Sequence, residues 1–144
     1  MPSRHKARQR AVQILYLLDM RKQDPAEALE GFYSSLAVPE GAERVPRDTF
    51  LEELVRGTID RQADIDARIT RHAAHWRMER MPTVDRNILR LAVYEMLVTD
   101  TPPPVLIDEA LELARQFAGE ESVHFVNGVL DAVHRELAAA TPQA

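Results

Sequence analysis

Hydrophobic residues recur three and four positions apart along nearly the whole chain. The pattern is strongest over residues 83–98, where one wide stripe contains Ile88, Leu89, Ala92, Val93, Met96 and Leu97. Because an α-helix makes one turn every 3.6 residues, this spacing places the apolar side chains on one face of a helix. The alternating pattern of a half-buried strand does not dominate any long segment. The sequence therefore predicts an all-α fold with this segment at the centre of the core.

Start and stop signals divide the chain into about seven helices. Ser3, Asp24, Asp48 and Thr83 are predicted N-caps, because their side-chain oxygens can accept hydrogen bonds from the free N–H groups at a helix start. The expected helices run from Ser3 to about Asp19, from Asp24 to Leu36, from Asp48 to Ile59, through Ile65, Ile69, Ala73 and Trp76 to a stop before Pro82, from Thr83 to the prolines at 102–104, from Ile107 to Phe117 with Gly119 as its stop, and from about Glu121 to Leu137.

Length and composition fit an ordinary globular domain. The chain has 144 residues, which is typical of one domain. The Pro and Gly residues of the segment 37–47 predict a long loop, which is also the best candidate for an internal boundary. It contains no cysteine, which excludes disulfides, thiolate nucleophiles and cysteine-ligated metal. It has no apolar stretch long enough for a membrane span and no secretory signal, so we expect a cytoplasmic protein.

Charge is distributed unevenly along the chain. The formal net charge is −5, yet the first 22 residues hold six cations against the single acid Asp19: Arg4, Lys6, Arg8, Arg10, Arg21 and Lys22. Cations at a helix start oppose the helix dipole, whereas a bound phosphate would reverse that effect. The basic segment is therefore a candidate docking site for a polyanion on an otherwise acidic body. We expect residues 1–10 to be poorly ordered until nucleic acid binds.

Motifs typical of enzymes are absent from the sequence, and we do not expect an enzyme. His72, His75 and Glu79 have the spacing of a metal site on one helix face, but a solvated helix end explains them better. Asp108, Glu109 and Glu112 favour the dipole in the first turns of their helix. Trp76 is predicted to lie in the core. Gly128, inside the last predicted helix, predicts close approach of a neighbouring helix.

Three segments carry a family resemblance. They are RHKARQRAVQILY near the start, WRMERMPTVDRNILRLAVYEML in the centre and PPPVLIDEALELARQFAGEESVHFVNGVLD near the end. In this order they resemble the NusB family of bacterial transcription antitermination factors. The resemblance covers most of the chain, is weakest between residues 22 and 48, and is most specific in the last block.

The resemblance implies both a fold and a function. It implies a single all-helical domain, residues 1–144, with two packed helical subdomains at about 1–62 and 63–137 and a frayed tail at 138–144. It implies no enzymatic activity and no cofactor. It further implies binding of boxA RNA in ribosomal RNA leader transcripts, jointly with NusE, a small-subunit ribosomal protein, in a complex with NusA, NusG and RNA polymerase. Family members include monomers and homodimers, so a homodimer is also possible.

The resemblance also assigns site residues. Contacts to RNA are implied for Arg4, His5, Lys6, Arg8 and Arg10, and for Glu121, Ser122, His124 and Phe125 at the start of the last helix. Contacts to NusE are implied for Tyr16, Glu79 and Asp85. Each position has an ordinary alternative: Phe125 lies on the apolar stripe and is expected in the core, Tyr16 can bury its ring, and the two acids can be solvated. His5 and His124 weaken the basic surface at neutral pH.

Two other functions remain open from the sequence. One is a helical protein-interaction module that does not bind RNA. The other is an accessory RNA-binding domain like the NusB-like domain of some ribosomal RNA cytosine methyltransferases. The length of the chain and the lack of a glycine-rich loop argue against a catalytic domain here.

Overall fold

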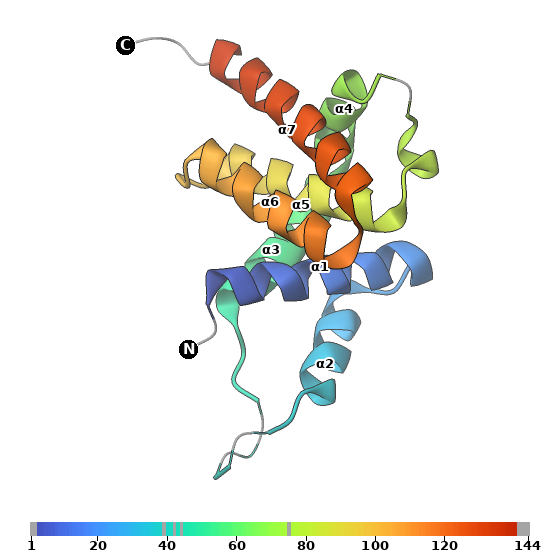
Figure 1. The fold of residues 1–144 in the computed structure, drawn as a ribbon. Helices are drawn as coiled ribbons and strands as arrows, with labels where there is room; N and C mark the ends of the chain where they lie inside the picture. Colours follow the sequence, from blue (N-terminus) through green and yellow to red (C-terminus); the bar gives the residue numbers. More distant parts are fainter. Residues whose placement is uncertain (1–2, 39, 42, 44, 75, 141–144) are drawn as a thin grey trace.

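The structure is a bundle of helices. The computed structural model describes residues 3–38, 40–41, 43, 45–74 and 76–140, and within them it contains seven α-helices, one 3-10 helix and no strand (Figure 1). The elements are α1 (Arg4–Arg21), α2 (Pro25–Ser35), α3 (Thr49–Asp60), α4 (Gln62–His72), η1 (Met78–Arg80), α5 (Thr83–Val98), α6 (Pro103–Phe117) and α7 (Glu120–Ala140). The predicted all-α fold is confirmed.

Local capping sets several helix ends as the sequence predicts. Ser3 Oγ accepts a hydrogen bond from the Lys6 N–H at 3.0 Å, and the Asp24 carboxylate accepts one from the Ala26 N–H at 3.1 Å. Asp48 caps α3 in the same way. Each cap satisfies an N–H group that has no partner inside its helix.

Other helix boundaries differ from the prediction. Thr83 is not an N-cap: Pro82 precedes α5, and Thr83 is its first residue. α6 already starts at Pro103, because the first turn of a helix tolerates a residue without an N–H group. α4 ends at His72, short of the predicted stop before Pro82. α7 continues to Ala140, and residues 141–144 of the expected frayed tail lie outside the described residues.

α5 lies at the centre of the core, as predicted. It packs against α1, α3, α4, α6 and α7, and the side chains of Ile88, Leu89 and Val93 are completely buried. Residues from all seven α-helices join one continuous apolar cluster. α1 lies across the molecule between α2 on one side and α5 on the other (Figure 1). No helix among the described residues is long and apolar enough to cross a membrane.

Two predictions about packing are wrong. Trp76 was expected in the core, but it lies beyond the end of α4 and is 48% exposed. Its ring makes a T-shaped contact with the Phe125 ring, with centroids 6.2 Å apart. Gly128 was expected to face a close neighbouring helix. It is exposed, and a Cβ built on it would meet no atom within 4 Å.

We expect Gly128→Ala to raise the free energy of unfolding by about 1 kcal/mol. Alanine has the higher helix propensity, and the added methyl group meets open space. Urea unfolding of the wild type and the variant measures the change. A loss of stability would mean that another surface packs against this face of α7.

The close helix contact is at Gly57 instead. A Cβ built on this α3 residue would lie 2.2 Å from the Cζ and hydroxyl oxygen of Tyr94, a buried α5 side chain. Only a residue without a side chain allows α3 and α5 to approach this closely across that ring. Burial also raises the pKa of Tyr94.

Gly57→Ala is therefore expected to cost about 1–3 kcal/mol of stability, because the tyrosine ring must shift within a packed core. The matched control is Gly31→Ala in α2, where nothing lies within 4 Å and no such cost is expected. Thermal unfolding should also show that Gly57→Ala costs less in a Tyr94→Leu background than in the wild type. Equal costs in the two backgrounds would contradict the contact.

Candidate nucleic-acid interface

The first turns of α1 carry cations that have no carboxylate partner among the described residues; Arg4 and Lys6 are exposed, and Arg10 is half-buried. Among the described residues, no ion pair involves Arg4, Lys6 or Arg10. The Arg4 guanidinium lies 4.6 Å from the centroid of the Phe50 ring, and that of Arg10 lies 5.6 Å from the centroid of the Phe32 ring. Aromatic faces hold a cation in place without neutralising it. These three side chains therefore present net positive charge at a helix N-terminus.

Arg8 has a different position from its neighbours. It is 5% exposed and makes two hydrogen bonds to the carboxylate of Glu95 in α5, at 2.8 and 3.0 Å; Glu95 is only 2% exposed. His5 Nδ1 lies 2.8 Å from Glu109 Oε2 in α6. Two of the five positions on α1 for which RNA contacts were expected are thus engaged within the protein.

These contacts also bear on the order of the chain start. α1 is helical from Arg4 onward, and Ala7 and Arg8 are buried. The Arg8 pair attaches the first turns of α1 to α5. The expectation that residues 1–10 are poorly ordered until nucleic acid binds stays a prediction. Residues 1–2 lie outside the described residues.

The start of α7 forms the second group of expected RNA positions. Glu121 and His124 are exposed, and Phe125 is half-buried beside Trp76. Ser122 donates its hydroxyl hydrogen to the Asp85 carboxylate, with distances of 2.8 and 3.0 Å to the two oxygens. The structure thereby joins one expected RNA position to one expected NusE position.

Asp85 lies inside the protein. It is 3% exposed at the start of α5, and burial raises the pKa of its carboxyl group, while the hydrogen bond from Ser122 acts in the opposite direction. Its side chain ties α5 to α7 and presents almost no surface to a partner. Glu79, in contrast, is exposed in η1.

An apolar groove of about 340 Å³ adjoins the basic end of α1. Its lining consists of Val12, Gln13, Tyr16, Leu17, Val84 and Phe117, from α1, the start of α5 and the end of α6. Tyr16 is 36% exposed. The family resemblance pointed to Tyr16, whereas the groove around it was not predicted. A signal was present, since Val12, Tyr16 and Leu17 lie off the main apolar stripe of α1.

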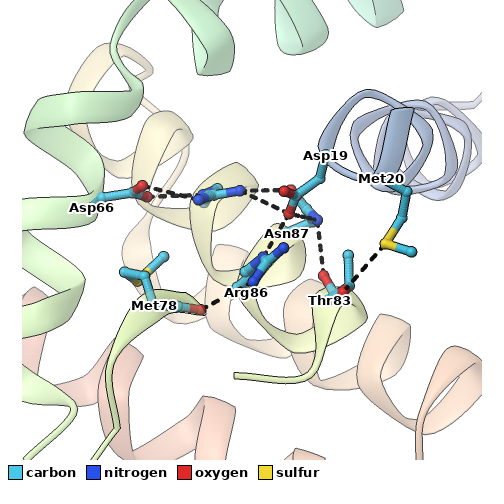
Figure 2. A network of polar contacts seen from close by, with 8 residues as sticks. Asp19, Met20, Asp66, Met78, Thr83, Arg86 and Asn87 are labelled. Carbon is cyan, nitrogen blue, oxygen red and sulfur yellow. Dashed lines mark hydrogen bonds and ion pairs between the residues drawn. The ribbon is translucent and has the colours of Figure 1, made fainter. Parts of the chain in front are cut away.

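A polar network holds the other end of α1 (Figure 2). Asp19 of α1 accepts hydrogen bonds from Arg86 at 2.5 Å, Asn87 at 3.0 Å and Arg90 at 3.1 Å. Arg90 also makes two hydrogen bonds to Asp66 of α4, at 2.8 and 2.9 Å. Burial alone would raise the pKa of Asp19, but these hydrogen bonds and positive charges hold it below its ordinary value.

The same network positions η1. Arg86 donates a second hydrogen bond, 3.1 Å long, to the carbonyl oxygen of Met78, the residue before Glu79 (Figure 2). Thr83 donates its hydroxyl hydrogen to Met20 Sδ at 3.7 Å. The exposed acid Glu79 is therefore held by α5, whose first residues also contact α1.

The described residues contain no group of three or more metal-ligating side chains that could hold an ion. His72 Nε2 lies 3.7 Å from Glu136, whereas His75 lies outside the described residues. Asp108, Glu109 and Glu112 were expected in the first turns of their helix, but α6 starts at Pro103 and its first turn contains no acid. Glu109 instead contacts His5.

Taken together, these features define a class of protein: a small all-helical binding protein in which one helix carries both a cationic end and an apolar groove. The NusB family model matches residues 5–135. The transcription antitermination protein NusB of Solibacter usitatus is 63% identical over 137 residues, which cover 95% of this chain and 92% of that protein. The chain thus belongs to the NusB family and is a transcription antitermination factor.

Solved structures agree with the sequence comparison. NusB from T. maritima has a TM-score of 0.76 and 34% identity, and the match covers 94% of each chain. A crystal structure of antitermination factors NusB and NusE in complex with dsRNA has a TM-score of 0.77 and 28% identity, with 92% of this chain and 96% of that chain covered.

Proposed function

We propose that this protein binds boxA RNA of ribosomal RNA leader transcripts jointly with NusE, and that the complex supports antitermination by RNA polymerase with NusA and NusG. The observation that carries the proposal is the surface of α1, where cations without carboxylate partners lie next to an apolar groove. A related NusB has been crystallised with NusE and dsRNA, which supports the same two kinds of partner. The proposed role is regulatory rather than enzymatic, and the proposed location is the cytoplasm, where bacterial transcription takes place.

The structure allows a finer assignment of roles within this proposal. Arg4, Lys6 and Arg10 bind RNA phosphates, helped by the free N–H groups in the first turn of α1. Arg8 and His5 hold α1 against α5 and α6 and so position those cations.

The start of α7 supplies the second RNA contact. Glu121, His124 and Phe125 provide its surface, and Ser122 is fixed beneath them by Asp85. Asp85 thus acts on the site through Ser122.

The NusE surface comprises Tyr16, the groove around it and Glu79. A partner side chain that fills the groove would bury apolar surface, and the acid would attract a basic ribosomal protein. A second copy of this chain could occupy the same groove. Size-exclusion chromatography of the wild type and Tyr16→Ala distinguishes the two occupants, because only a homodimer would dissociate in the variant without NusE present.

We also propose that the single domain is divided at about residue 62 into two helical subdomains. Arg61 separates α3 from α4, which supports a boundary at that point.

Salt dependence tests the RNA-binding role. If three phosphates are contacted, the affinity for single-stranded boxA RNA should fall with salt with a log–log slope of about −2, and Lys6→Ala should make the slope shallower by roughly 0.7. Fluorescence anisotropy of labelled RNA measures both values. The matched control is Arg21→Ala at the opposite end of α1, which should leave the slope unchanged.

The outcomes of this experiment separate the candidate functions. Binding that tightens when NusE is added supports the joint complex. Absence of RNA binding by the folded protein, with and without NusE, would refute the proposal and leave a protein-interaction module.

A further inference from the structure

A second cavity lies beside the proposed phosphate contacts. It has a volume of about 200 Å³ and lies between α1, α2 and the end of α6. We call it the amide pocket, after the side-chain amides of Gln9, Gln13 and Gln116 in its lining. The remaining lining residues are Lys6, Arg10, Phe32, Leu36 and Phe117. Typical small-molecule sites begin at roughly 300 Å³, so this pocket is suited to one ring system rather than a whole ligand.

The amide pocket offers hydrogen-bonding groups that have no other partner in the described part of the chain. Gln9 Nε2 donates to Gln116 Oε1 at 2.6 Å, which ties α1 to the end of α6. This bond uses only one group of each amide. The carbonyl oxygen of Gln9 and the amino group of Gln116 have no partner among the described residues. Together they offer one acceptor and one donor among the residues that line the pocket.

A neighbouring donor and acceptor is the pattern that nucleobase edges present. Unpaired RNA bases are recognised by hydrogen bonds to these edges together with stacking on aromatic rings or guanidinium groups. Phe32 and Phe117, both half-buried, supply the rings, and Arg10 already lies over Phe32. The pocket thus combines both kinds of contact.

Charge and position indicate which ligand would enter the pocket. Lys6 and Arg10, two of the proposed phosphate contacts, lie at the pocket itself, so a backbone bound there brings its bases to the amides. The pocket also shares Gln13 and Phe117 with the apolar groove. A strand seated here would therefore lie next to a protein bound in the groove.

We propose that the amide pocket holds one unpaired base of the bound RNA and that Gln9 and Gln116 read its edge. This inference rests on the proposed RNA binding and adds residues that determine specificity. Phosphate contacts position a protein on RNA but cannot distinguish bases, whereas contacts to a base edge can.

The test uses boxA RNA and a set of derivatives that each lack one base. For the wild type, the derivative that lacks the base held in the pocket should bind about tenfold more weakly than the intact RNA. This is the loss of affinity expected when one base loses its stacking and hydrogen bonds. For the double variant Gln9→Leu/Gln116→Leu, intact RNA should bind about as weakly as that derivative, and removing the base should have no further effect. The salt slope should be the same for both proteins.

The matched control is Gln23→Leu/Gln62→Leu, which removes two amides from a different cavity at the other end of α1 and should behave as the wild type. A wild type that binds RNA but loses no affinity with any single base removed would refute the pocket alone. The pocket would also be refuted if the Gln9→Leu/Gln116→Leu variant bound the intact RNA and every derivative with the same affinities as the wild type. That result would favour a protein side chain as the occupant of the pocket. Failure of the wild type to bind RNA at all would refute both this inference and the proposed function.

Discussion

Arg8→Met is expected to lower the free energy of unfolding by about 3–5 kcal/mol. The variant keeps much of the volume of the side chain but leaves the Glu95 carboxylate, 2% exposed, without the two hydrogen bonds it receives from Arg8. A buried charge that loses its partner retains the cost of leaving water without the compensating attraction. Urea unfolding followed by circular dichroism measures the loss.

The matched control is Arg4→Met, one turn earlier on the same helix. Arg4 is exposed and rests on Phe50, so its loss should change stability by no more than about 1 kcal/mol while weakening RNA binding. Arg8→Met/Glu95→Leu should recover much of the stability, because two apolar side chains can replace a buried pair. If Arg8→Met were as stable as the wild type, Arg8 would be free to bind RNA directly.

Arg90→Met should cost about 3 kcal/mol at neutral pH. Arg90 joins Asp19 of α1 to Asp66 of α4 (Figure 2). Among the described residues, its removal leaves Asp66 without a partner and Asp19 with Arg86 and Asn87. The cost is placed at the lower end of the range for broken buried pairs because Asp19 keeps those two donors. Denaturant unfolding at neutral pH checks the value.

The pH dependence of this effect has a definite sign. The pKa of Asp19 is held below its ordinary value of 3.8, so Asp19 contributes stability that is fully present above that value and is lost as the pH falls through the lowered pKa. The difference between wild type and Arg90→Met should therefore shrink in acid. Arg135→Met, which breaks an exposed pair with Asp131 in α7, serves as the control and should change little at any pH. A difference that stays constant down to the acid range would contradict the network.

The parts of the fold that could be predicted depend on local chemistry. A cap such as Ser3 or Asp24 acts within three residues, and the stripe of α5 is visible within one helix. Thr83 was misassigned by the same local logic, because Pro82 took the capping position without a side-chain hydrogen bond. Residue type alone does not show whether a threonine at a helix start lies just before the helix or is its first residue.

The parts that could not be predicted depend on contacts between distant segments. Arg4 and Arg8 look alike in the sequence, and only the fold places Glu95, 87 residues away, next to one of them. Gly57 and Gly128 both lie inside helices, yet only Gly57 faces an aromatic ring. Lys6 and Tyr16 could be selected as candidate site residues from the sequence, and both are exposed. Arg8 and Asp85 were selected in the same way, but their burial could not be predicted.

The attachment of α1 at both ends constrains how the length of this protein can vary in evolution. Lys6 and Tyr16 lie about 15 Å apart along a helix that Arg8 and Asp19 fix to α5. Inserting one residue between them would rotate the proposed RNA contact by roughly 100° relative to the proposed NusE contact, so the two would no longer lie on the same face. Insertions and deletions should therefore be excluded from this stretch and accumulate between α2 and α3, where no helix has to keep its register.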